Sequence, residues 1–114
     1  MDSIIFSGNV GRDPEFKETD SYKQARFSVA VTHRVKGERE TEWRNVTIFG
    51  KSAEFVRDYV TKGRTVIVEG HPAVRVYKNK AGEPAAVMDV TASAVELIGS
   101  AARDGDGGEE PMPF

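Results

Sequence analysis

Apolar and polar residues alternate along short stretches of the chain, which is the pattern of half-buried strands. Between residues 26 and 35, Phe27, Val29 and Val31 fall on one side, and polar or small residues fall on the other. Glycine, proline or charged turns separate this stretch from others of the same kind. The further predicted strands are residues 4–8, 42–49, 64–69, 73–77 and 86–97.

One helix is predicted, and it lies between the third and fourth of these strands. Ser52 is the expected N-cap, and Glu54 lies in the first turn. Lys62 lies in the last turn, and Gly63 is expected to end the helix. Its apolar face consists of Phe55, Val56, Tyr59 and Val60. Five or so strands with one helix at this point predict an all-β OB-fold, a five-stranded Greek-key barrel, although strand count alone also allows an SH3-like barrel.

The composition is that of one ordinary globular domain. The chain has 114 residues, of which 39% are hydrophobic and 30% charged, and this length is too short for two separate cores. No apolar run approaches the roughly 20 residues that cross a bilayer, and residues 4–6 are too few for the core of a secretory signal. We therefore expect a soluble, cytoplasmic protein with no membrane partner. The absence of cysteine excludes disulfides and thiolate metal sites.

The last part of the chain differs from the rest. Residues 99–114 are rich in glycine and acids and carry no periodic apolar pattern, so we expect a flexible acidic tail after a folded domain at residues 1–98. The net charge of the whole chain is −2, and residues 1–99 carry 15 basic and 14 acidic residues. A strongly basic nucleic-acid-binding domain would carry more positive charge, so the placement of charges matters more than their sum.

The strand at residues 42–49 carries the most informative side chains. Val46 and Ile48 are expected to face the core, which places Trp43 and Phe49 on the outer face. Exposed rings can stack on nucleobases, with about 1–3 kcal/mol for each base and little sequence preference. Tyr77 repeats this pattern on its own strand. The alternative is that these rings belong to the core or to a subunit interface.

Basic residues are interleaved with these aromatic residues. Such a spacing suits a groove that follows a phosphate backbone, although each basic residue taken singly is more often a solvated surface charge. The candidate phosphate contacts are Arg34, Lys36, Arg44, Lys51, Arg75, Lys78 and Lys80.

The sequence offers no catalytic constellation. It has no phosphate-cradling Walker loop, no nucleophile elbow and no carboxylate cluster at metal-binding spacing. His33 and His71, the latter expected in a turn before Pro72, read as structural or solvated residues. We therefore expect no enzyme activity, no cofactor and no metal.

Six sequence blocks resemble the bacterial single-stranded DNA-binding protein family in order and near-spacing, and the match spans roughly residues 3–98. The blocks are GNVGRDPE (8–15), FSVAV (27–31), TEWR (41–44), IFGKSAE (48–54), YVTKG (59–63) and VIVEG (66–70). The resemblance implies an OB-fold that forms a homotetramer and binds single-stranded DNA without sequence preference. It also implies a role in protecting that DNA during replication, recombination and repair, and with it a cytoplasmic (nucleoid-associated) location.

The resemblance also implies residue roles. Trp43 and Phe49 resemble the family's base-stacking aromatics, and Tyr77 lies where members often have a stacking tryptophan. The end of the tail is similar to the family's tip that recruits partner proteins, with the residues Glu109, Glu110, Met112, Pro113 and Phe114. The chain departs from the family where many members have a further tryptophan, at residues 33–35, and in a linker of only about ten residues, which restricts the reach of the tip.

Two other classes of binding protein remain open on the sequence. A primosome-type OB-fold adaptor that mainly bridges replication proteins would be a dimer with weak DNA binding. An OB-fold RNA chaperone would distinguish RNA from DNA through the 2′-hydroxyl.

Overall fold

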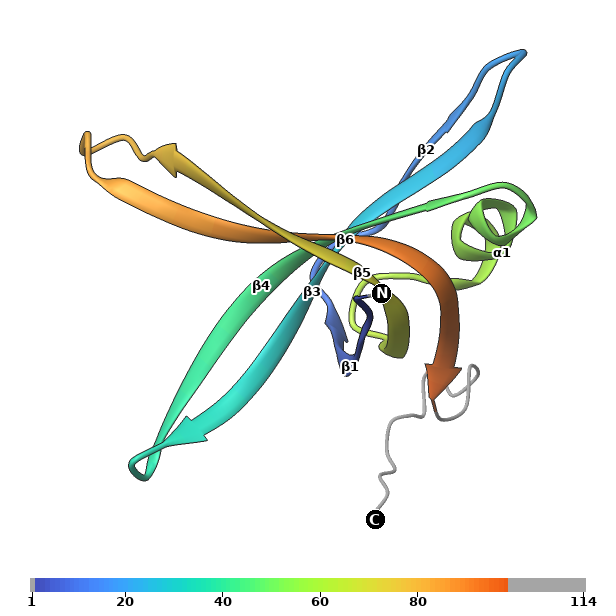
Figure 1. The fold of residues 1–114 in the computed structure, drawn as a ribbon. Helices are drawn as coiled ribbons and strands as arrows, with labels where there is room; N and C mark the ends of the chain where they lie inside the picture. Colours follow the sequence, from blue (N-terminus) through green and yellow to red (C-terminus); the bar gives the residue numbers. More distant parts are fainter. Residues whose placement is uncertain (1, 99–114) are drawn as a thin grey trace.

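The computed structural model describes residues 2–98, which form a closed barrel of strands with one helix (Figure 1). The elements are β1 (Ile4–Val10), β2 (Glu15–Glu18), β3 (Lys23–Val35), β4 (Glu38–Phe49), α1 (Lys51–Tyr59), β5 (Thr65–Lys78) and β6 (Pro84–Ile98). The strand order is β1-β5-β6-β4-β3-β2, and β1 also pairs with β3. This extra pairing closes β1, β3, β4, β6 and β5 into a five-stranded barrel, with the helix after the third barrel strand, as expected for an OB-fold.

The barrel core follows from the alternation in the sequence. Phe27, Val29 and Val31 of β3 are buried, as are Val46 and Ile48 of β4. The core contains apolar side chains only among residues 2–98, so its stability comes from apolar burial, at about 25 cal/mol per Å² removed from water. The other buried apolar residues are Phe6, Val10, Ala25, Ala53, Val56, Val60, Val66, Val68, Val90 and Ala92.

The helix exists where it was predicted, but its predicted caps were wrong. Gly50, with a φ of 80°, is the N-cap, and no side chain caps the first turn. A positive φ favours glycine, and it lets the chain turn from β4 into α1 within one residue. The helix ends at Tyr59, with Val60 as C-cap, so Lys62 lies beyond its last turn.

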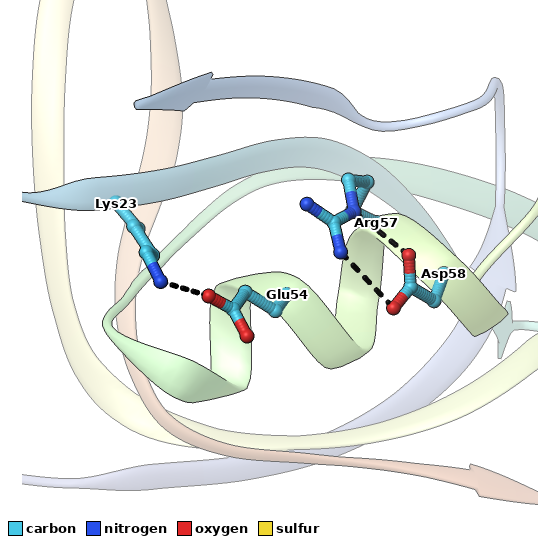
Figure 2. A network of polar contacts seen from close by, with 4 residues as sticks. All are labelled: Lys23, Glu54, Arg57 and Asp58. Carbon is cyan, nitrogen blue, oxygen red and sulfur yellow. Dashed lines mark hydrogen bonds and ion pairs between the residues drawn. The ribbon is translucent and has the colours of Figure 1, made fainter. Parts of the chain in front are cut away.

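The two faces of α1 also differ from the prediction. Ala53 and Val56 are the buried residues of the helix, whereas Phe55 and Tyr59 are exposed and pack on each other with ring centroids 5.2 Å apart. Figure 2 shows two polar contacts of α1: Lys23 of β3 bonds to Glu54 and ties the helix to the sheet, and Arg57 pairs with its helix neighbour Asp58 at 2.7 Å.

The sequence prediction missed one strand and divided another. β2 was missed, and it pairs with β3 from Glu15↔Arg26 to Glu18↔Lys23. β5 is one continuous strand rather than two, so His71 and Pro72 lie within it and not in a turn. The register with β6 shifts at Glu69/Gly70. Pairing with β6 on both sides of Pro72 keeps the backbone extended at this proline.

Two long hairpins project from the barrel as arms, and Figure 1 shows them diverging at the left of the view. The β3–β4 arm ends in a two-residue turn, in which Lys36 (φ 53°) and Gly37 (φ 83°) both have positive φ, as a type I′ hairpin turn requires. The β5–β6 arm ends at Asn79, whose side-chain oxygen accepts hydrogen bonds from the backbone N–H groups of Ala81 and Glu83.

Candidate nucleic-acid interface

The outer faces of β3, β4, β6 and β5 form one continuous surface. Across β3 and β4, Trp43 lies opposite Ala30, and Phe49 lies opposite Gln24. In the parallel pairing of β4 with β6, Asn45 lies beside Asp89, and its amide group donates a hydrogen bond of 3.3 Å to that carboxylate. Because side chains that are direct partners share a face, these positions place the aromatic residues of β4 and the polar residues of β6 on the same side of the sheet.

The three predicted aromatic residues are all exposed on this side of the strands. Trp43 is 53% exposed, Phe49 is 48% exposed and Tyr77 is 45% exposed. The alternative that these rings belong to the core of the subunit is thus excluded. Trp43 and Phe49 lie on the barrel at β4, and Tyr77 lies near the end of the β5–β6 arm.

The Trp43 ring lies against the backbone of Gly11. A Cβ atom added at Gly11 would be 2.4 Å from Cζ3 of Trp43, which is too close for any side chain at that position while the ring stays where it is. Gly11 therefore lies close against the six-membered ring of the indole, and about half of the tryptophan side chain remains open to solvent.

A fourth aromatic residue joins this surface, and sequence reasoning missed it. Tyr22, 40% exposed, packs edge-on against Phe49 with ring centroids 6.1 Å apart. It immediately precedes β3 and has the same parity as Gln24, the partner of Phe49. Continuing the alternation of the predicted strand backward would have placed Tyr22 on the outer face, because it lies two residues before Gln24.

The predicted cation Arg75 shares the outer face with Asp89. Its guanidinium donates hydrogen bonds of 2.9 and 3.3 Å to the two carboxylate oxygens. The hydrogen bond from Arg75 holds the pKa of Asp89 below its ordinary value, and the bond from Asn45 adds to this effect. At neutral pH the positive charge of Arg75 is therefore already shared with a carboxylate.

Five other predicted cations lie at the exposed ends of the surface. Arg34 and Lys36 lie at the tip of the β3–β4 arm, and Lys78 and Lys80 lie at the tip of the β5–β6 arm. Lys51 begins α1, two residues after Phe49. Within residues 2–98 none of these five forms an ion pair, so their charges are available to an anionic partner.

Arg44 does not fit the predicted role of phosphate contact. It has the same parity as Val46 and Ile48, so it lies on the opposite face of β4 from Trp43. Its side chain is only 11% exposed, its guanidinium lies 4.8 Å from the centre of the Phe6 ring, and it pairs with Glu42 at 3.0 Å. The hydrogen bond from Arg44 is the main reason that the pKa of Glu42 is lowered. The structure therefore places Arg44 apart from the aromatic surface.

Other predictions concern features outside this surface. The tip residues Glu109, Glu110, Met112, Pro113 and Phe114 lie outside the described residues. Between residues 2 and 98 no group of three or more acidic or histidine side chains is arranged to hold a metal ion. The same part of the chain contains no helix with the length and hydropathy of a membrane span.

Comparison with known sequences identifies close parallels. A model of the single-strand binding protein family matches residues 1–98. Single-stranded DNA-binding protein 1 of Staphylococcus aureus (strain MSSA476) is 34% identical over 102 residues, which cover 86% of this chain and 65% of that relative. Single-stranded DNA-binding protein 2 of S. aureus (strain Mu50 / ATCC 700699) is 32% identical, over 86% of this chain and 72% of the relative. The match to the first relative thus spans less than two thirds of its length.

Solved structures show the same architecture. A Plasmodium falciparum SSB in complex with ssDNA has a TM-score of 0.72 and 21% identity, over 87% of this chain and 96% of the other. The small single-stranded DNA-binding protein of Streptomyces coelicolor has a TM-score of 0.71 and 25% identity, over 84% and 93%. The predicted OB-fold is confirmed. With a family model that matches most of its length and relatives above 30% identity, this chain belongs to the single-strand binding protein family.

Proposed function

We propose that the protein binds single-stranded DNA without enzymatic turnover and with little dependence on sequence. The observation that carries the proposal is the continuous outer face on which Trp43, Phe49 and Tyr77 are each about half exposed. The names of the relatives support the same ligand. Single strands expose the faces of their bases, which duplexes hide, so a surface of outward aromatic rings selects single strands.

In this mechanism, bases stack on the aromatic rings while cations hold the phosphates. Each stacked base contributes on the order of 1–3 kcal/mol. Each phosphate contact releases condensed counterions, so that the affinity falls as the salt concentration rises. The cations assigned to this role are Arg34, Lys36, Lys51, Lys78 and Lys80, whereas the guanidinium of Arg75 is held by Asp89.

The direct test is the substitution Trp43→Ala. We expect binding to a labelled oligo-dT to weaken by about 1–3 kcal/mol, because one stacking platform is lost. Fluorescence anisotropy of the DNA label measures this without the tryptophan signal. The variant should keep its circular dichroism spectrum, since the ring lies outside the core. Unchanged affinity in a folded Trp43→Ala variant would reject the stacking assignment.

We further propose that the protein assembles as a homotetramer. A tetramer with twofold symmetry needs two different self-complementary interfaces on each subunit. Two separate groups of exposed apolar residues support this: Ile5, Ile67 and Ile98 on the outer face of β1, β5 and β6, and Val74 and Val76 on the β5–β6 arm. Residues 4–8 of β1 also have one edge without a partner strand among the described residues.

The cellular role that fits these properties is protection of single-stranded DNA during replication, recombination and repair, with recruitment of partner proteins by the tip at residues 109–114. An apolar segment behind two glutamates can fill an apolar pocket with a basic rim. Deletion of residues 112–114 should keep the affinity for oligo-dT and abolish capture of DNA repair enzymes in a pull-down. Equal capture by the shortened protein would reject the recruiting role.

A further inference from the structure

Two small depressions lie next to each other on the barrel, and one of them borders the Trp43 ring. The first is lined by Gly11, Arg12, Ser28 and Trp43 itself. The second shares Arg12 and Ser28 with the first, and its lining also includes Phe27, Asn45 and Val46. Their volumes of about 250 and 100 Å³ lie below the roughly 300–1,000 Å³ of clefts that enclose drug-sized ligands. An occupant of the second depression is therefore as small as the edge of one nucleobase.

The charges around the second depression do not suit a phosphate group. Arg12 and Arg26 line it together with Asp13 and Glu15, so the four side chains carry no net charge. A phosphate would meet two carboxylates as well as two guanidinium groups. Neutral ligands that carry both hydrogen-bond donors and acceptors match this lining better.

The side chains of Arg26 and Glu15 are both available to such a ligand. They are direct cross-strand partners between β3 and β2, yet they form no ion pair with each other, and within residues 2–98 neither pairs with another charged side chain. Asp13 is different, because one of its carboxylate oxygens already accepts a hydrogen bond of 2.9 Å from the backbone N–H of Lys62.

We propose that this depression is a binding site for guanine, which gives the protein a preference for guanine within otherwise sequence-tolerant binding. Guanine presents two adjacent acceptors, O6 and N7, which match the guanidinium fork of Arg26. It also presents two adjacent donors, N1–H and the N2 amino group, which match the two oxygens of the Glu15 carboxylate. No other DNA base presents both an adjacent pair of acceptors and an adjacent pair of donors.

The position of the site fits the path of a single strand. A base stacked on Trp43 lies over the first depression, and Arg12 borders both depressions. The neighbouring base of the same strand can then turn its edge into the second depression. This inference rests on the proposed function, because it places the guanine in a strand that Trp43 already holds.

The test compares short strands that differ in one base. Labelled oligo-dT is titrated beside strands whose central thymine is replaced by guanine, adenine, cytosine, hypoxanthine or 7-deazaguanine. We expect the guanine strand to bind at least about five-fold more tightly than oligo-dT, the low end of what one bidentate pair discriminates. Hypoxanthine lacks the N2 amino group and 7-deazaguanine lacks the N7 acceptor, so each should lose most of this preference.

Protein variants test whether Glu15 and Arg26 produce the preference for guanine. In Glu15→Gln and in Arg26→Gln, the ratio of the affinities for the guanine strand and for oligo-dT should fall toward one. The ratio is the readout because it cancels any general change in DNA affinity. Glu18→Gln is the matched control: it removes the same charge from the same strand, β2, outside the lining of the depression, and it should keep the wild-type ratio.

The outcomes separate the two proposals. Equal affinity for the guanine strand and oligo-dT, with Trp43 fluorescence quenched by both, would overturn the guanine site and leave DNA binding in place. Adenine or cytosine bound as tightly as guanine would overturn it as well, as would an unchanged ratio in both Glu15→Gln and Arg26→Gln. Failure of the wild-type protein to bind any strand would overturn the proposed function itself.

Discussion

The position of a single indole ring depends on a residue that has no side chain. Gly11 follows β1 and is 32 positions away from Trp43 in the sequence, but the ring lies directly on its backbone. Its φ is ordinary, so glycine is needed here for space and not for backbone conformation. The atoms that a new Cβ would meet belong to the far end of the tryptophan side chain, which can swing away without moving the barrel.

Gly11→Ala therefore tests whether the position of the Trp43 ring against Gly11 matters for DNA binding. We expect the fold to be retained and the affinity for oligo-dT to fall by up to the 1–3 kcal/mol that the loss of one stacking ring costs. Anisotropy titration measures the affinity. In a Trp43→Ala background, Gly11→Ala should cost nothing further, because no ring remains to be displaced. An equal loss in both backgrounds would show that Gly11 acts through something other than Trp43.

Residue alternation predicted part of this surface and missed the rest for identifiable reasons. Trp43 and Phe49 were placed correctly because β4 alternates regularly against a buried strand. Arg44 was assigned to the surface by its nearness to Trp43 in sequence, although alternation places it with Val46 on the other face. Tyr22 precedes the predicted strand, and its contact with Phe49 depends on the β3–β4 register, which a single sequence does not specify.

At the scale of elements, β5 and β6 bring an acid onto the surface proposed to bind DNA. Asp89 lies between Asn45 and Arg75 and bonds to both. Its pKa is lowered, chiefly by Arg75, so the carboxylate remains charged at neutral pH. The stability that this pair contributes is present above the unfolded-state pKa of Asp89 and is lost as the pH falls through its lower folded-state pKa. The Asp89 carboxylate of β6 therefore keeps the charge of Arg75 partly neutralised at every physiological pH.

Asp89→Asn should strengthen DNA binding by freeing Arg75 for phosphate. With one more phosphate contact, the slope of log K against log salt should become steeper by about 0.7. Oligo-dT titrations at several salt concentrations measure the slope. The same substitution should remove part of the loss of stability at acidic pH, which thermal melts between neutral and acidic pH measure. Arg75→Gln added to Asp89→Asn is the control and should return the slope to the wild-type value. A slope that Asp89→Asn leaves unchanged would contradict this account of Arg75.

The boundaries of the elements were harder to predict than their existence. All barrel strands were found, because each has a buried apolar side, but the sequence split β5 at His71-Pro72. Fourteen cross-strand partners in β6 keep β5 extended through that point. Likewise, residues 38–41 of β4 and residues 84–85 of β6 are polar or small, and they are strands only because the opposite strand of each arm pairs with them.

At the scale of the whole molecule, the arms and the barrel leave apolar surface that the subunit does not cover. Val74 and Val76 are 67% and 70% exposed, and Ile5 is 66% exposed. β-Branched side chains at this exposure gain nothing from burial within the subunit. Val74 and Val76 share the inward parity of Val66 and Val68, whereas Ile67 lies on the outer face of the barrel with Ile5. The two groups therefore face different directions, as two distinct interfaces require.

Charged substitutions at the two groups should dissect the proposed tetramer stepwise. Ile67→Glu and Val76→Glu each place a charge in one interface, so each is expected to convert tetramers into dimers, because a buried unpaired charge is costly. The double variant should be a monomer with an intact barrel, since both positions are exposed in the subunit. Light scattering coupled to size exclusion measures the mass. Thr61→Glu, an exposed position between α1 and β5, is the control and should remain tetrameric. A wild-type monomer, or single variants that keep the tetrameric mass, would reject the two-interface assembly.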